Sequence, residues 1–101
     1  MTPDNRVAIA ATLLERGALR HTPAGIPAIE MTLRHRSRQP EAGGEREVEC
    51  ELFAVAFGEL AMAIAAVTPG TALRCQGFIA RRYRTGTTLA LHLTRFESTD
   101  I

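Results

Sequence analysis

Arginines are the residues of this chain whose type and spacing suggest chemistry. Six of the twelve arginines fall within residues 34–38 and 81–84, and the chain contains no lysine. The formal net charge is only +1, so positive charge is concentrated and not abundant. A guanidinium is a planar fork that holds phosphate through two hydrogen bonds and stacks on bases. The clusters indicate an anion site, with nucleic acid as the first candidate. The plain alternative is charge that keeps exposed loops soluble.

Catalytic and metal-binding chemistry finds little support in the sequence. The three histidines have no carboxylate or cysteine at ligand spacing. Glu47, Glu49 and Glu51 line one strand face, but alternate residues of a strand lie about 6.6–7 Å apart, so they share an ion only with ligands from elsewhere. The sequence has no phosphate-binding glycine loop, nucleophile elbow or Cys-x-x-Cys pair. We therefore expect a binding protein that is not an enzyme and that needs no metal or cofactor.

Length and composition limit the size and class of the protein. The 101 residues suffice for one domain, and we expect residues 1–101 to form a single domain with a core of about residues 5–97. Hydrophobic residues make up 46% of the chain, and no segment approaches the roughly 20 apolar residues that cross a bilayer. The N-terminus does not resemble a secretory signal, so we expect a cytoplasmic protein. Cys50 and Cys75 are expected to be buried, reduced thiols.

Five strand-like segments and one helix account for most of the chain. We expect the strands at residues 6–14, 29–36, 46–57, 72–82 and 88–97. An alanine-rich helix over residues 58–67 is stopped by Thr68-Pro69-Gly70, and residues 39–45 form a loop. One short helix between the third and fourth of five strands is the element order of the OB-fold. We therefore predict an all-β, five-stranded OB-fold barrel, with an SH3-like barrel as the alternative.

Side-chain alternation assigns faces to the second and third strands. Ile29, Met31 and Leu33 face one way, and the arginines at 34 and 36 face the other. His35 shares the register of Leu33, so it either points inward or helps the arginines to hold phosphate. The third strand alternates until Leu52 and is apolar on both faces from 53 to 57. We therefore expect a bulge or sharp bend near Leu52.

The order and spacing of several short motifs resemble those of a known family. The motifs are Asn5-Arg6-Val7, residues 22–27, Leu33-Arg34-His35-Arg36-Ser37 with Gln39, Glu41-Ala42-Gly43, Gln76-Gly77-Phe78-Ile79 and Leu91-His92. From about residue 5 to 97 the chain resembles the primosomal replication protein N family (PriB), bacterial relatives of the single-stranded DNA-binding protein. Residues 57–61 also agree with the latter protein, which carries a long tail with an acidic tip. Because this chain stops at Ile101, directly after the last strand, we favour the primosomal family.

The resemblance implies an OB-fold homodimer that binds single-stranded DNA and whose interface lies among the first strand and its neighbouring loops. Members help to restart stalled replication forks by joining the PriA helicase to DnaT, and the single-stranded DNA-binding protein is a further candidate partner. The implied DNA contacts lie in the second-to-third strand region and in the loop between the fourth and fifth strands. The resulting DNA-binding candidates are Arg34, Arg36, Arg38, Arg46, Arg81, Arg82, Tyr83 and Arg84. Tyr83, flanked by arginines, is the expected stacking residue.

The acidic row of the third strand departs from the family pattern. Relatives have aromatic residues at positions that correspond to Gly44 and Glu49. The two arginine clusters would form two loop-borne edges of one groove, with Glu47, Glu49 and Glu51 between them. Carboxylates repel phosphate, so we expect weaker DNA binding than in aromatic-bearing relatives. Alternatively, this row docks a basic partner in a protein-interaction adaptor with little DNA affinity, or the chain is a tail-less single-stranded DNA-binding protein.

Overall fold

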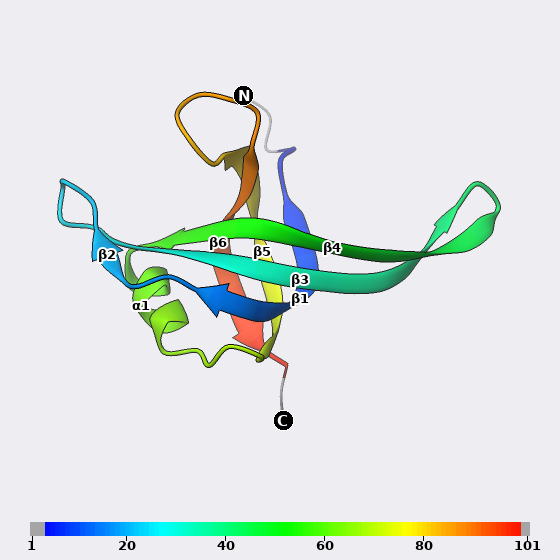
Figure 1. Cartoon of the computed structure of the whole chain (residues 1–101), viewed down its shortest axis with the longest axis horizontal. Helices are drawn as coiled ribbons and strands as arrows, with labels where there is room; N and C mark the ends of the chain where they lie inside the picture. Colours follow the sequence, from blue (N-terminus) through cyan, green and yellow to red (C-terminus); the bar gives the residue numbers. More distant parts are fainter. Residues whose placement is uncertain (1–3, 100–101) are drawn as a thin grey trace.

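The computed structural model describes residues 4–99, which form six strands and one helix (Figure 1). The elements in chain order are β1 (Val7–Arg16), β2 (Arg20–His21), β3 (Pro27–Glu41), β4 (Gly44–Phe57), α1 (Glu59–Ala65), β5 (Ala72–Arg81) and β6 (Leu89–Ser98). The five predicted strands and the helix are all confirmed. The two-residue β2, which pairs with the start of β3, was not predicted. Within residues 4–99 no helix is long and apolar enough to span a bilayer.

The strands close into a five-stranded barrel. The sheet order is β1-β5-β6-β4-β3, and an additional pairing of β1 with β3 completes the circle. All of these pairs are antiparallel except β4 with β6, which is parallel and short. Because α1 lies between β4 and β5, the helix separates the third and fourth barrel strands. The predicted OB-fold is therefore confirmed.

Alternating apolar side chains fill the barrel. The fully buried side chains come from several strands of the barrel. They include Leu13 on β1, Ile29 and Leu33 on β3, Leu73 on β5 and Leu91 on β6. The helix contacts β3, β4 and β6 and contributes the fully buried Ile64 to the same core. The face assignment of β3 made from the sequence is confirmed, because Ile29, Met31 and Leu33 are buried.

Gly77 permits the close approach of β5 to β6. A Cβ at this position would collide with the backbone carbonyl of His92. The register of the two strands shifts between Gln76 and Gly77, immediately before the pairing of Phe78 with His92. Glycine is needed here for space, because no side chain fits between the two backbones. The close approach brings two aromatic rings together on the outside of the barrel.

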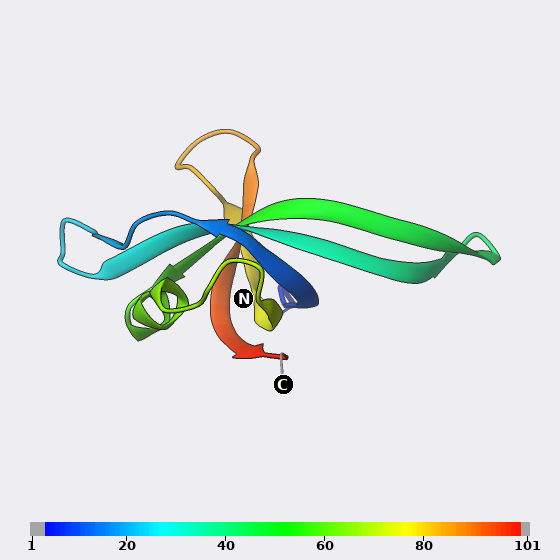
Figure 2. The same ribbon diagram turned by 60° about the horizontal axis from the view of Figure 1, so that its bottom comes forward.

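A long hairpin arm extends from the barrel (Figures 1 and 2). Strands β3 and β4 pair without interruption from Ala28 and Phe57 to Glu41 and Gly44. We call residues 34–51 of this hairpin the arm. Its tip is a two-residue turn, Ala42-Gly43, in which both residues have positive φ, as in a type I′ turn. The expected loop over residues 39–45 is therefore wrong, because most of it is strand.

The expected bulge or bend near Leu52 is also wrong. The β3–β4 register contains no shift. Alternation continues through the apolar end of β4, with Ala54 and Ala56 buried and Phe53 and Phe57 exposed. The apolar residues on the second face belong to an exposed surface and do not mark a change in backbone direction.

The two cysteines differ in environment. Cys75 on β5 is buried in the core, and burial raises the pKa of its thiol to about 11. Cys50 is exposed, so the prediction of a buried thiol is wrong for this residue. The physical reason is the length of the arm, which carries Cys50 beyond the barrel core. Both thiols are free.

Candidate nucleic-acid interface

Four rings lie on the outside of the barrel and form what we call the aromatic face. They are Phe53 and Phe57 on β4, Phe78 on β5 and His92 on β6. Phe78 and His92 stack, with ring centroids 5.0 Å apart and planes inclined by 18°. Phe57 lies 6.1 Å from His92 in a tilted arrangement. The three phenylalanines are 40–44% exposed. Exposed rings in a row can stack unpaired bases without regard to their sequence.

The sequence analysis did not identify the aromatic face as a candidate site. The signal was present in residues 53–57. Phe53, Val55 and Phe57 are all apolar, although alternation places them on the face of the strand that should meet solvent. A strand at a barrel surface needs no apolar outer face for stability, so such residues indicate a ligand or partner. His92 lies on this face of the sheet, and its neighbour is the stacked ring of Phe78.

One cation is held against this face. The Cζ atom of Arg82 lies 3.7 Å from the ring centroid of Phe53 and 5.1 Å from that of Tyr83. The Nη2 group of Arg82 donates a hydrogen bond to Glu30 Oε2 at 3.0 Å, and the Nη2 group of Arg20 donates one to Glu30 Oε1 at 3.1 Å. Glu30 therefore links the loop after β5 to the start of β2 through two charge-assisted hydrogen bonds.

Two hollows adjoin this group. One, of about 90 Å³, is lined by residues that include Arg20, Phe57 and His92. The other, of about 320 Å³, is lined by residues that include Arg16 and Thr32. Glu30, Phe53 and Arg82 line both hollows. The Arg82–Phe53 pair is thus a shared boundary between two concave parts of the surface.

The second arginine cluster lies where the sequence predicted it, at the end of β5 and in the loop before β6. Arg81 is the last residue of β5, and the backbone N–H of Arg82 donates to the carbonyl of Thr88 across the base of the loop. Tyr83 is 57% exposed. Among residues 4–99, no carboxylate forms an ion pair with Arg81 or Arg84. These two guanidiniums are free for phosphate.

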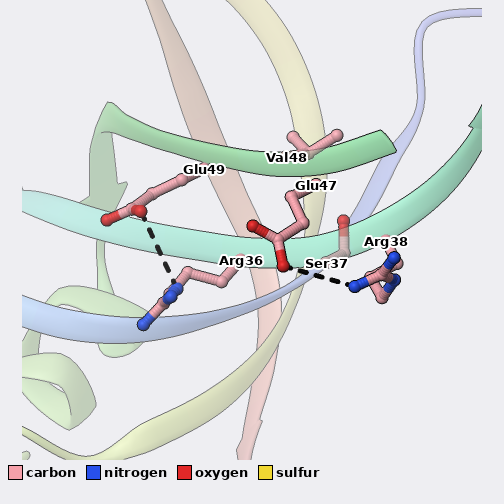
Figure 3. Close-up of a pocket in the computed structure, with 6 residues that line it drawn as sticks. All are labelled: Arg36, Ser37, Arg38, Glu47, Val48 and Glu49. Carbon is pink, nitrogen blue, oxygen red and sulfur yellow. Dashed lines mark hydrogen bonds and ion pairs between the residues drawn. The ribbon is translucent and has the colours of Figure 1, made fainter. Parts of the chain in front are cut away.

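The first cluster lies on a strand and faces the acidic row directly. In the β3–β4 register, the arginines at 34, 36 and 38 stand opposite the glutamates at 51, 49 and 47. We call these six residues the charged ladder. The ion pairs in and beside it are Arg34–Glu49 at 3.5 Å, Arg36–Glu49 at 3.8 Å, Arg38–Glu47 at 3.2 Å and Arg38–Glu45 at 3.3 Å. Figure 3 shows two of them, Arg36–Glu49 and Arg38–Glu47.

The expected groove with two loop-borne edges and an acidic strand between them is therefore wrong. The acidic row is the cross-strand partner of the first arginine cluster, because a two-residue turn sets the register of β3 against β4. By alternation along β4, Glu47, Glu49 and Glu51 share a face with Phe53 and Phe57. The charged ladder thus continues the aromatic face along the hairpin.

Arg46 does not join the charged ladder. It alternates with Glu45 and Glu47 along β4 and stands opposite Gln39, on the other face of the arm. Its Nη1 lies 3.1 Å from a carboxylate oxygen of Glu41. Arg46 is accordingly separated from the other arginine candidates by the thickness of the hairpin.

His35 points inward, which decides between the two interpretations left open by the sequence. Its Nδ1 lies 2.7 Å from the carbonyl oxygen of Ala10, and its Nε2 lies 2.7 Å from Ser37 Oγ. A carbonyl oxygen only accepts, so Nδ1 carries a proton and donates. Both ring nitrogens are used within the protein, and His35 ties the base of the arm to β1.

Comparison with known proteins assigns the chain to a family. Residues 5–95 match the family model described as another single-strand binding protein family. The chain is 45% identical to Replication restart protein PriB of Bordetella pertussis over 89 residues. The aligned region covers 88% of this chain and 83% of the relative. It is 38% identical over 89 residues to Replication restart protein PriB of Nitrosomonas europaea, with 88% and 82% covered.

Solved structures agree with this assignment. The PriB structure from Ralstonia solanacearum superposes with a TM-score of 0.88 at 35% identity and covers 95% of this chain and 98% of that chain. The wild-type single-stranded DNA binding protein from Thermus aquaticus shares the fold, with a TM-score of 0.75 at 20% identity over 95% of this chain and 50% of that chain. The chain therefore belongs to the PriB replication restart proteins, within a single-strand binding protein family built on the OB-fold.

Proposed function

We propose that this protein binds single-stranded DNA on the aromatic face and serves replication restart in the cytoplasm as an accessory protein without enzymatic activity. The observation that carries the proposal is the row of rings beside an arginine-bearing loop, made of the exposed Phe53, Phe57 and Phe78 and the half-buried His92. Stacking platforms next to cations are what an unpaired strand requires, since bases stack and phosphates are neutralised. The names of the relatives, which refer to replication restart and to single-stranded DNA binding, support the same role.

The candidate residues contribute unequally in this proposal. Arg81 and Arg84 contact phosphate directly, and the exposed Tyr83 adds a further stacking surface. Arg34, Arg36 and Arg38 reach phosphate only by exchanging their carboxylate partners. Exposed ion pairs of this kind are worth about 0–1 kcal/mol each, so the exchange is possible but lowers the gain from every contact. The result is a modest DNA affinity.

Replacing the rings tests the proposal. We expect Phe57→Ala and Phe78→Ala each to weaken binding of a fluorescein-labelled oligo(dT), measured by anisotropy, by about 5- to 100-fold, since stacking is worth about 1–3 kcal/mol per base. Met62→Ala is the matched control, because Met62 is an exposed apolar residue on α1, outside the aromatic face. If all three variants bind like the wild-type protein, the aromatic face is not the DNA site.

The partner-protein part of the proposal rests on the arm. We propose that the protein bridges the PriA helicase to DnaT, with the single-stranded DNA-binding protein as a further candidate partner. The arm projects from the barrel and displays the charged ladder, and the carboxylate of Glu51 forms no ion pair within residues 4–99. A projecting acidic edge suits a basic partner surface. An adaptor with little DNA affinity is the second candidate function.

One variant separates the two functions. Replacing Glu47, Glu49 and Glu51 by glutamine removes the acidic row and leaves the arginines. If the row docks a partner, the affinity for PriA or DnaT, measured by surface plasmon resonance, falls while DNA binding persists. If the row only opposes DNA, oligo(dT) affinity rises and partner binding stays constant.

The proposal includes a homodimer. Strand β1 pairs with β3 through residues 12–16, and residues 7–11 pair only with β5 among the described strands. This leaves one edge of β1 open to a strand from a second copy. Light scattering on the purified protein measures the mass directly, and a monomer at micromolar concentration would contradict this part of the proposal.

A further inference from the structure

Glu30 occupies an unexpected position for a carboxylate in a DNA-binding site. It lies on β3 beside the aromatic face and holds two of the arginines that a DNA strand would otherwise meet. We propose that Glu30 is a positioning residue, which fixes Arg82 over Phe53 as a platform for a base and keeps Arg82 and Arg20 from binding phosphate. This inference rests on the proposed function and specifies how two of the arginines take part in it.

The contacts of Arg82 set it apart from its neighbours in the loop. Its side chain is 23% exposed, whereas the residues Arg81, Tyr83 and Arg84 are exposed. It touches the Phe53 ring through Cζ at 3.7 Å and the Glu30 carboxylate at 3.0 Å. The contact with Glu30 joins residues that lie 52 positions apart in the chain. These contacts hold the Arg82 side chain in one position, whereas an exposed arginine without such contacts moves freely.

Arg82 also changes what Phe53 can offer. A guanidinium 3.7 Å from the ring centroid covers that ring, so a base cannot stack directly on the covered face. The guanidinium is itself planar and stacks on aromatic groups. The ring of Tyr83 also lies against the guanidinium, with its centroid 5.1 Å from Cζ. A base next to this group therefore meets the part of Arg82 that the two rings leave uncovered, and Arg82 extends the stacking surface of Phe53. Its place between the two hollows leaves concave surface on both sides for neighbouring bases.

Glu30 determines whether Arg82 supports stacking of a base or binds phosphate. Both of its carboxylate oxygens are engaged, one by each arginine, so the two guanidiniums share one negative charge and the group keeps a net charge of +1 instead of +2. A guanidinium that shares its charge with a carboxylate binds the phosphate of an incoming strand less strongly and contributes less to salt-dependent binding. Without Glu30, both side chains would be free cations at the edge of the aromatic face. The carboxylate thus lowers the part of the DNA affinity that depends on salt and favours base stacking, which salt does not screen.

Salt dependence of binding provides the test. For single strands, the slope of log K against log salt steepens by about 0.7 for each phosphate neutralised. We expect Glu30→Gln to steepen the slope for oligo(dT) by about 0.7, since loss of the single carboxylate charge leaves one more positive charge for phosphate. The variant should bind more tightly than the wild-type protein at low salt and several-fold more weakly at high salt, so that the two lines cross.

Glu97→Gln is the matched control. It makes the same change in charge and removes a similar exposed ion pair, Arg74–Glu97 at 3.7 Å, at the far end of β5 and β6. We expect its slope to equal that of the wild-type protein. Arg82→Lys complements it, because lysine keeps the charge but lacks a planar face. This variant should lose binding at high salt.

A measurement without DNA separates failure of the inference from failure of the proposed function. The Arg82 Nε–H resonance in nitrogen-15 NMR should be displaced by the ring current of Phe53, and Glu30→Gln should abolish that displacement. If the wild-type protein binds no oligonucleotide but this resonance responds, the proposed function fails while the positioning of Arg82 stands. An unchanged resonance, or binding lines for Glu30→Gln that run parallel to the wild-type line, would overturn the inference.

Discussion

Glu49 lies between two arginines of the neighbouring strand. Its two carboxylate oxygens are 3.5 Å from Arg34 Nε and 3.8 Å from Arg36 Nε. In the proposed function, a DNA phosphate has to compete with this glutamate for the same guanidiniums. Since all three side chains are substantially exposed, the pairing is weak enough to be exchanged and strong enough to compete.

Removing the acidic row should strengthen DNA binding. In the variant with Glu47, Glu49 and Glu51 all replaced by glutamine, Arg34, Arg36 and Arg38 lose their cross-strand partners from that row. We expect oligo(dT) affinity near 50 mM salt to rise by about 3- to 10-fold and the salt slope to steepen, because more phosphates are neutralised.

A variant with Asp4→Asn, Glu59→Gln and Glu97→Gln carries the same change in net charge outside the ladder. It controls for the general attraction of a more positive protein to DNA. An equal gain in both variants would show that the charged ladder does not compete with phosphate.

Tyr83 should contribute through its ring and not through its hydroxyl. It is 57% exposed and lies between arginines of the loop. We expect Tyr83→Ala to weaken oligo(dT) binding by about 5-fold or more, and Tyr83→Phe to bind like the wild-type protein, because both rings can stack. Anisotropy titrations of the two variants check this. Equal affinities for the alanine and phenylalanine variants would exclude a stacking role.

Gly77→Ala should destabilise the barrel. The added methyl group would collide with the backbone carbonyl of His92, and a backbone atom cannot move away as a flexible side chain can. We expect a loss of about 1–3 kcal/mol in the free energy of unfolding, measured with urea. Gly44→Ala is the control, since a Cβ there meets nothing within 4 Å and its φ is not positive. A stability equal to that of the wild-type protein would show that β5 and β6 separate easily.

Alkaline pH should weaken the fold through Cys75. Burial raises the pKa of this thiol from 9.0 to about 11, so the folded state retains a proton that the unfolded state releases. The stabilising contribution is fully present below pH 9 and is lost as the pH rises towards 11. A difference of two pKa units corresponds to about 2–3 kcal/mol.

Urea unfolding at pH 8 and pH 10.5 measures this effect, with Cys75→Ser as the control that lacks the thiol. The decrease in stability should be larger in the wild-type protein than in the control. Ellman's reagent adds a second readout at pH 8, where the exposed Cys50 should react in the folded protein and Cys75 only after unfolding. Equal reaction of both thiols in the folded state would contradict the burial argument.

The sequence alone determined the elements of this fold and its family. Alternation at Ile29, Met31 and Leu33 identified the core face of β3, and Pro69 with Gly70 marked the end of the helical segment. These features could be predicted because strand alternation, helix periodicity and turn residues depend on near neighbours in the chain. The order of short motifs along residues 5–97 pointed to the family that the comparisons confirm.

Only the tertiary structure decided which charges and rings meet. The turn at Ala42 and Gly43 sets the register that places Glu49 against Arg34 and Arg36, and the length of the arm exposes Cys50. Closure of the barrel brings Glu30, Phe53 and Arg82 together from three separate segments. Such contacts depend on where the turn between β3 and β4 falls and on how the strands close into a barrel, and closure arises from the packing of the whole core. The pattern of residues within one strand does not specify contacts between strands. The first arginine cluster is therefore paired with carboxylates of the neighbouring strand, and Arg82 of the second cluster is held by Glu30.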